Sequence, residues 1–183
     1  KDSPLRTTTK ARLDSLDQQL DNWVSELEKY THEQHNQAGE NRGWSAMQCM
    51  HHLLLSEKYS LQYLRKKISY DPKVDKVGFS AYWRMGVLRI YLGLPLKFKA
   101  PAMIATDKLP ETSDLQETAQ AYREHRLDLR RYLSDLDPKW YDRAVYKHPF
   151  AGRLGINQML GFFKWHFVRH QKQGDRAIRR VAP

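Results

Sequence analysis

The chain has 183 residues and a hydrophobic content of 40%, which suits one globular domain with a sizeable core. It contains no uncharged apolar run of about 18 residues or more, which excludes an apolar membrane-spanning helix. The single cysteine, Cys49, excludes an internal disulfide and fits a reducing compartment, so we expect a cytoplasmic protein.

The net charge of +10 is concentrated toward the end of the chain. Basic residues gather in REHRLDLRRYL, residues 123–133, and in DRAIRRVAP, residues 175–183. Such an excess raises the question of nucleic-acid binding. The sequence shows no RNA-recognition signature, zinc finger or basic leucine zipper, and a basic helical face is more commonly a solvated surface. A nucleic-acid partner is therefore the least favoured interpretation.

The first 70 residues predict two long helices. Residues 9–31 carry apolar side chains every three or four positions, and HNQAGENRG, residues 35–43, ends this helix with two glycines. The second helix begins near Ser45, a favourable N-cap, and continues to about residue 68.

Two further helices are predicted in the second half of the chain. One begins within ETSDLQE, residues 111–117, where Thr112 or Ser113 can cap it, and LDPKW closes it. The last runs from about residue 156 to residue 178. We find no internal repeat and no apolar–polar alternation typical of strands. The pattern predicts an all-α protein, a four-helix bundle that forms a single domain over residues 1–183.

A long crossover, residues 71–110, connects the second and third helices. It is too long for a featureless loop in a compact domain. SAYWRMGVLRIYLG, residues 80–93, predicts an extra short helix, and the prolines of PLKFKAP, residues 95–101, favour an extended segment. We expect Trp83, Trp140 and Trp165 to pack in the core or line a cleft, with the core favoured.

Two histidines lie one helical turn apart in GFFKWHFVRHQKQ, residues 161–173. His166 and His170 share the apolar face of the last helix, so both are predicted to point toward the core. Burying two imidazoles without partners costs several kcal/mol, and a shared cation removes that cost by accepting a lone pair from each. The alternative is a pair of histidines hydrogen-bonded to carbonyl groups or water.

A third ligand should come from a facing helix, and the second helix offers His51 and His52. Periodicity slightly favours His51, which lies near the axis of the apolar stripe. Each helix of a bundle contacts two neighbours, however, and His52 belongs to a second seam of the same helix. Spacing alone leaves the choice open.

Two motifs resemble a known family. The first consists of Trp44, Ser45, His52, Leu53 and Glu57. The second is HPFAGRL, residues 148–154, followed by QMLGFFKWHFVRHQKQ, residues 158–173. In this order and spacing they resemble the DinB/YfiT-like metalloenzyme family, and the resemblance spans most of the chain.

The resemblance implies a bundle in which three histidines bind a divalent metal and leave solvent-exposed positions open. Carried over to this chain, the ligands become His52, His166 and His170, which decides for His52 and makes His51 a neighbouring or surface residue. Gly174 departs from the family, where an apolar residue follows the glutamine. Because glycine costs a helix about 1 kcal/mol relative to alanine, we expect the last helix to loosen there.

Three neutral imidazoles leave the charge of a dication largely uncompensated, so bound water becomes acidic and a thiol can bind as thiolate. The family implies transfer of a low-molecular-weight thiol to an electrophile, which is slightly preferred, or hydrolysis of a small-molecule substrate. Zinc, nickel, iron and manganese all fit imidazole donors. A homodimer is expected. The alternative function is a non-catalytic, metal-binding, stress-related protein.

The sequence indicates no decisive general base. Ligand histidines usually need a hydrogen-bond acceptor on the second ring nitrogen. Candidates for such support are Glu57, Gln48, Tyr59 and His148. Of these, Glu57 lies more than one turn from His52, and His148 is expected to fix the loop before the last helix. Cys49 is expected to be a small buried apolar residue and not a ligand.

Overall fold

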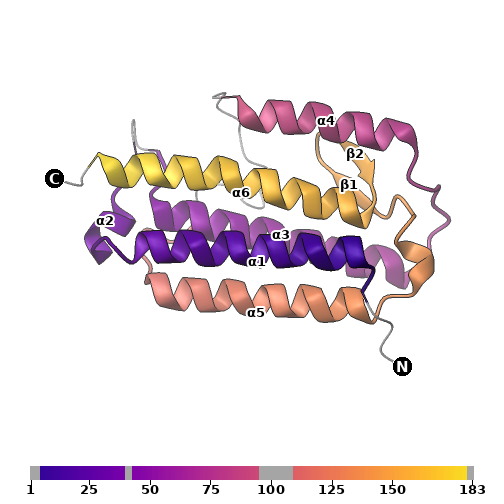
Figure 1. Cartoon of the computed structure of the whole chain (residues 1–183), viewed down its shortest axis with the longest axis horizontal. Helices are drawn as coiled ribbons and strands as arrows, with labels where there is room; N and C mark the ends of the chain where they lie inside the picture. The colour runs from indigo at the N-terminus through magenta and orange to yellow at the C-terminus, as the bar shows by residue number, and fades with distance from the viewer. Residues whose placement is uncertain (1–4, 40–42, 95–108, 181–183) are drawn as a thin grey trace.

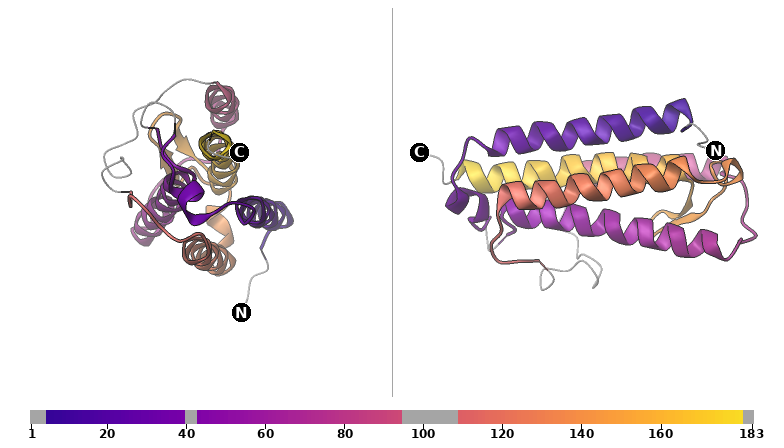
Figure 2. Two further views of the ribbon diagram at one scale, coloured as in Figure 1. Left: turned by 90° about the vertical axis from the view of Figure 1, so that its left-hand side faces the viewer. Right: turned by 90° about the horizontal axis from the view of Figure 1, so that it is seen from below.

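The computed structural model describes residues 5–39, 43–94 and 109–180. Within them, four long helices form a bundle: α1 (Thr7–Leu27), α3 (Ala46–Ser69), α5 (Leu115–Ser134) and α6 (Ile156–Arg179). α1 and α6 run in one direction and α3 and α5 in the other (Figure 1). α6 contacts α1 and α3 on one side of the bundle, and α5 contacts the same two helices on the other (Figure 2). The prediction of an all-α bundle is confirmed.

Polar side chains set the beginnings of α3 and α5. Ser45 and Gln48 form a capping box, in which each side chain accepts the backbone N–H of the other residue at 3.1 Å. α5 is capped by Asp114, whose carboxylate accepts the N–H of Glu117, and not by Thr112 or Ser113 as predicted. α1 ends at Leu27, before the predicted residue 31, and a short helix, α2 (His32–Asn36), follows it.

The extra helix predicted in the crossover is present as α4 (Phe79–Gly93). It lies outside the four-helix bundle and packs along α6 (Figures 1 and 2). The predicted extended segment 95–101 lies outside the described residues. Among the described helices, none combines the length and apolar character that crossing a membrane requires.

The three tryptophans that were expected mainly in the core differ in burial. Trp140 is buried in the 3-10 helix η4 (Pro138–Trp140), and Trp165 is partly buried under the guanidinium of Arg89. Trp83, on α4, is 64% exposed, so its predicted burial in the core is wrong.

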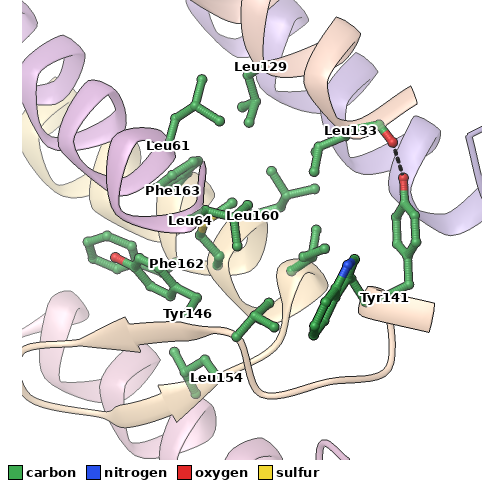
Figure 3. Close-up of a cluster of buried hydrophobic side chains, with 14 of the residues drawn as sticks. Leu61, Leu64, Leu129, Leu133, Tyr141, Tyr146, Leu154, Leu160, Phe162 and Phe163 are labelled. Atoms are coloured by element: carbon green, nitrogen blue, oxygen red, sulfur yellow. Dashed lines mark hydrogen bonds between the residues drawn. The ribbon is translucent and has the colours of Figure 1, made fainter. Parts of the chain in front are cut away.

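A small antiparallel hairpin precedes α6, and the sequence did not predict it. β1 (Tyr146–His148) pairs with β2 (Gly152–Leu154), with Tyr146 opposite Leu154 and His148 opposite Gly152. Strands of three residues are too short for an alternating pattern to emerge. Tyr146 and Leu154 are buried in the core at this end of the bundle (Figure 3).

The buried apolar side chains form two clusters along the bundle. One, at the hairpin end, includes Leu61, Leu133 and Phe163 (Figure 3). The other, toward α2, includes Trp23 and Phe167.

A buried ion pair lies between these clusters along α3 and α5. Arg126 donates from Nε and Nη2 to the two carboxylate oxygens of Glu57 at 2.6 and 2.7 Å. The Tyr122 hydroxyl donates to the same carboxylate at 2.6 Å. The core therefore has a polar layer in which both oxygens of the Glu57 carboxylate accept hydrogen bonds, and this layer links α3 to α5.

Candidate metal centre

Three histidines meet between the antiparallel helices α3 and α6. α3 supplies His52, and α6 supplies His166 and His170 from successive turns. Nε2 of His52 lies 3.2 Å from Nε2 of His166, and ring nitrogens of all three residues lie within 4.8 Å of one another. The three residues are only 3%, 8% and 8% exposed. The structure thus brings together the three histidines that the family resemblance implied as metal ligands.

The environment favours the neutral form of the His166 and His170 rings. Burial holds the pKa values of His166 and His170 well below the usual range, and the nearby histidines and the Arg169 guanidinium lower them further. A neutral imidazole keeps one nitrogen lone pair free for a cation. The cluster is therefore prepared for metal binding at neutral pH.

Gln173 fixes the orientation of one of the rings. Its side-chain oxygen, Oε1, accepts a hydrogen bond from Nδ1 of His170 at 3.1 Å. Since Nδ1 then carries the proton, Nε2 of His170 has the lone pair. Sequence reasoning assigned no role to Gln173, although its position three residues after His170 placed it on the same helical face.

Aromatic rings cover the cluster. Trp44, just before α3, lies with its ring 4.6 Å from that of His52 and 5.6 Å from that of His170. Phe162 stacks on His166 at 4.9 Å. These apolar walls limit the water around the histidines and strengthen electrostatic interactions at the site.

The donor set fits a divalent transition metal. Two nitrogens about 2.0–2.1 Å from one ion, at angles of roughly 90–110°, lie about 2.8–3.4 Å apart. The 3.2 Å separation between His52 and His166 falls in this range. The cluster has three nitrogen donors and includes no carboxylate among the described residues, which favours zinc, nickel or iron over calcium or magnesium and makes manganese the least favoured of the four expected metals.

The candidates for supporting residues occupy different places. Glu57 is bound to Arg126 and Tyr122 in the polar layer, and Gln48 belongs to the cap of α3. Tyr59 lies two helical turns beyond His52 and is partly buried.

His148 is buried at the hairpin and contacts the site through an aromatic ring. Its ring packs edge-on against Phe162 at 4.4 Å, and Phe162 stacks on His166. Nδ1 of His148 accepts the N–H groups of Phe150 and Ala151. This placement agrees with the expectation that His148 fixes the loop before α6.

The remaining nearby candidates lie away from the cluster. His51 is partly buried, and its Nε2 lies 3.3 Å from the hydroxyl of Thr118 on α5. Cys49 is buried and free, and burial raises the pKa of its thiol. Both agree with the roles expected from the sequence.

Gly174 does not loosen the last helix, so that expectation is wrong. α6 continues to Arg179, and a Cβ atom at position 174 would lie 2.9 Å from the ring of Trp23 and 3.1 Å from Cα of Ala46. Glycine is needed there because α6 approaches α1 and the start of α3 closely.

A four-helix bundle with a buried cluster of three histidines defines a class of helical proteins suited to holding a metal ion. The chain matches the sequence profile of the DinB superfamily over residues 15–173 and therefore belongs to that superfamily. Neither the curated proteins nor the solved structures gave a match.

Proposed function

We propose that this protein is a metal-dependent enzyme in which His52, His166 and His170 hold one divalent metal ion. The carrying observation is the 3.2 Å approach of the His52 and His166 Nε2 atoms in a buried site where histidine pKa values are depressed. At this distance the two nitrogens can share a hydrogen bond or a cation, and the ring nitrogen of His170 within 4.8 Å favours the cation, because only an ion uses all three rings. A shared ion explains why α3 and α6 both direct a ring to the same point.

The proposed reaction is transfer of a low-molecular-weight thiol to a small electrophile, with hydrolysis as the second reaction of the same site. A bound dication supplies Lewis acidity, which lowers the pKa of a thiol or water at an open position. The chain contributes the geometry: Gln173 holds His170 in the required tautomer, and Trp44 and Phe162 keep the surroundings apolar. The family resemblance favours the thiol reaction.

Contacts of the basic segment weigh against a nucleic-acid-binding function. Arg123 pairs with Asp21, and Arg130 pairs with Asp14 and Asp17, all on α1. Arg126 is buried against Glu57. These three guanidinium groups bind carboxylates of their own chain, so this part of the charge excess is already compensated.

Metal analysis tests the site. Protein purified without chelator is expected to contain about one equivalent of a transition metal, and His52→Ala, His166→Ala and His170→Ala are each expected to lose it because a site with two ligands binds far more weakly. His51→Ala is the matched control, since it removes the adjacent histidine and should retain the metal. Circular dichroism confirms that each variant is folded. Unchanged metal content in folded cluster variants would refute the proposed site.

An activity screen separates the proposed reactions. Glutathione, bacillithiol and mycothiol are each offered with a model electrophile, before and after metal removal, and esters and amides are offered without thiol. Metal-dependent thiol addition supports the transferase, and metal-dependent cleavage supports the hydrolase. A folded, metal-loaded protein that turns over none of these substrates would favour the non-catalytic alternative.

A further inference from the structure

The outer face of α4 is apolar and exposed. Ala81 and Leu88 face the rest of the protein, whereas six large side chains, each 44–84% exposed, point outward. We call these residues the α4 stripe: Phe79, Tyr82, Trp83, Val87, Ile90 and Leu94. Its three aromatic residues alone expose about 400 Å², taking about 200 Å² for each full side chain. With its aliphatic residues, the α4 stripe exceeds the few hundred Å² typical of monomers and is comparable to the roughly 800 Å² that each partner contributes to a stable interface.

A glycine lies in the middle of this exposed face. Gly86 is in the interior of α4, where glycine costs a helix about 1 kcal/mol relative to alanine. A Cβ atom at position 86 would meet nothing within 4 Å, in contrast to Gly174. No contact with residues 5–39, 43–94 or 109–180 therefore accounts for this glycine. Close approach of another helix does account for it, because glycine lets two backbones come near each other.

Four residues of the α4 stripe are spaced symmetrically about its centre. If two copies of α4 are placed antiparallel, with a two-fold axis between positions 86 and 87, Phe79 lies opposite Leu94 and Trp83 opposite Ile90. The same axis places Val87 opposite Gly86, so that a side chain meets an empty position. In these three pairs a larger residue faces a smaller one, as a self-complementary interface requires, whereas Tyr82 falls opposite Tyr91, which lies outside the α4 stripe.

The charges beside the α4 stripe favour a protein partner over an anionic surface. Arg84 donates to the carbonyl oxygens of Ala151 and Arg153 at 2.7 and 2.8 Å. The guanidinium of Arg89 lies 4.2 Å above the ring of Trp165. Both cations are turned back onto their own chain, and the α4 stripe itself carries no charge. Surfaces that bind anionic lipid usually present lysine or arginine outward next to the apolar residues.

We propose that the α4 stripe is the interface of a homodimer in which α4 packs antiparallel against α4 of a second copy, with closest approach at Gly86. This inference does not depend on the proposed enzymatic function. α4 lies on the outside of the bundle along α6, so the contact requires no rearrangement of the four long helices (Figure 2).

Analytical ultracentrifugation of the full-length protein tests the interface. The wild type is expected to be a dimer at micromolar concentration. Ile90→Glu places a carboxylate against Trp83 of the second copy and should raise the dissociation constant at least about a hundredfold. Leu127→Glu is the matched control: Leu127 is 51% exposed on α5, on the far side of the bundle from α4, and the variant should remain dimeric (Figure 1).

Gly86→Ala provides a test that loss of folding cannot imitate. In dilute monomer the substitution should raise the thermal midpoint by about 2–4 °C, because alanine favours the helix. The added methyl group should nevertheless weaken the dimer by about tenfold or more, because it separates the two backbones. Val87→Cys, beside the axis, should form an intermolecular disulfide under mild oxidation, whereas Leu127→Cys should not; the native Cys49 is buried.

Three results would overturn the proposal. The first is a wild-type protein that stays monomeric at all accessible concentrations. The second is a dimer that survives both Ile90→Glu and Gly86→Ala. The third is a monomer that sediments with vesicles containing anionic phospholipid and loses this binding in Ile90→Glu, which would assign the α4 stripe to a lipid surface.

Discussion

His148 uses a ring nitrogen as a hydrogen-bond acceptor in a buried position. Its Nδ1 accepts the N–H groups of Phe150 at 3.2 Å and Ala151 at 3.1 Å, which closes the turn of the hairpin. Burial lowers the pKa of His148 to about 4. A proton on Nδ1 would break both hydrogen bonds, so the hairpin requires the neutral ring.

We predict that acid destabilises the fold partly through His148. Between pH 6.5 and pH 4 the unfolded chain takes up a proton on this ring and the folded chain does not, so the free energy of unfolding falls as the pH falls through this window. The contribution is at most about 3 kcal/mol. In His148→Asn the amide oxygen can accept the same two N–H groups without titrating.

Urea unfolding of the metal-free proteins at several pH values across this window measures the effect. His166 and His170 are common to both proteins, so their contribution cancels in the comparison. The variant is expected to show the shallower loss of stability in acid. Parallel curves for wild type and variant would show that His148 contributes nothing to the acid sensitivity.

Two features of the sequence predicted the histidine cluster: helical spacing for His166 and His170, and resemblance to a family for His52. The spacing of His166 and His170 on an apolar helical face predicted their burial, and the structure agrees. It could not choose between His51 and His52, because these adjacent residues of α3 face different neighbouring helices. His51 faces Thr118 on α5, whereas His52 faces α6. The resemblance to a family was needed because helical periodicity does not say which neighbour each seam contacts.

At the scale of single elements, the position of α6 depends on its close approach to α1 and α3 at Gly174. Trp23, the residue nearest to Gly174, is held by a hydrogen bond from its indole Nε1 to Asp175 at 2.9 Å. Its ring therefore has little freedom to move away, and Cα of Ala46 is backbone. A side chain at position 174 must push α6 away from its neighbours.

We expect Gly174→Ala to destabilise the protein by about 1–2 kcal/mol, because overpacking outweighs the gain in helix propensity. Gly161→Ala on the same helix is the control. There the added Cβ would lie 3.6 Å from Arg12 and 3.7 Å from Met85, which are ordinary contacts. That variant should gain up to about 1 kcal/mol. Thermal and urea unfolding measure the stability of both variants. A stabilised Gly174→Ala protein would contradict the role given to this glycine.

The elements differed in how far the sequence could predict them. The long helices follow from apolar residues at helical spacing, with ends correct to within a few residues. α4 was predicted as a helix, but apolar residues all round it are typical of a buried helix, which explains the wrong expectation for Trp83. The hairpin was missed because its strands have three residues each, and its pairing depends on contacts with α3 and α6.

For the whole molecule, the ion pair between Glu57 and Arg126 connects two helices in the middle of the core. Both side chains are almost fully buried, and the guanidinium binds the carboxylate through two parallel hydrogen bonds. Removing one partner leaves an uncompensated charge in a place of low polarity. The fold is therefore strongly destabilised when only one of the two residues is present.

We predict that Glu57→Gln lowers the free energy of unfolding by about 3–5 kcal/mol. Asp128→Asn is the matched control, since Asp128 forms a largely exposed ion pair with Arg65 between the same two helices. Its cost should stay below about 1 kcal/mol. Chemical denaturation at neutral pH measures both, and similar losses in the two variants would show that burial of the ion pair is unimportant.

His52 and His166 are 114 residues apart in the chain. An ion shared by their rings would act as a cross-link, closing a loop that contains α4, α5 and the hairpin and leaving α1 outside it. The unfolded chain would lose freedom for as long as the link lasts, so the metal would govern how slowly α3 and α6 separate, whatever reaction it serves. Cells could then remove the protein quickly when the ion is scarce, because the apo form would open sooner to proteases.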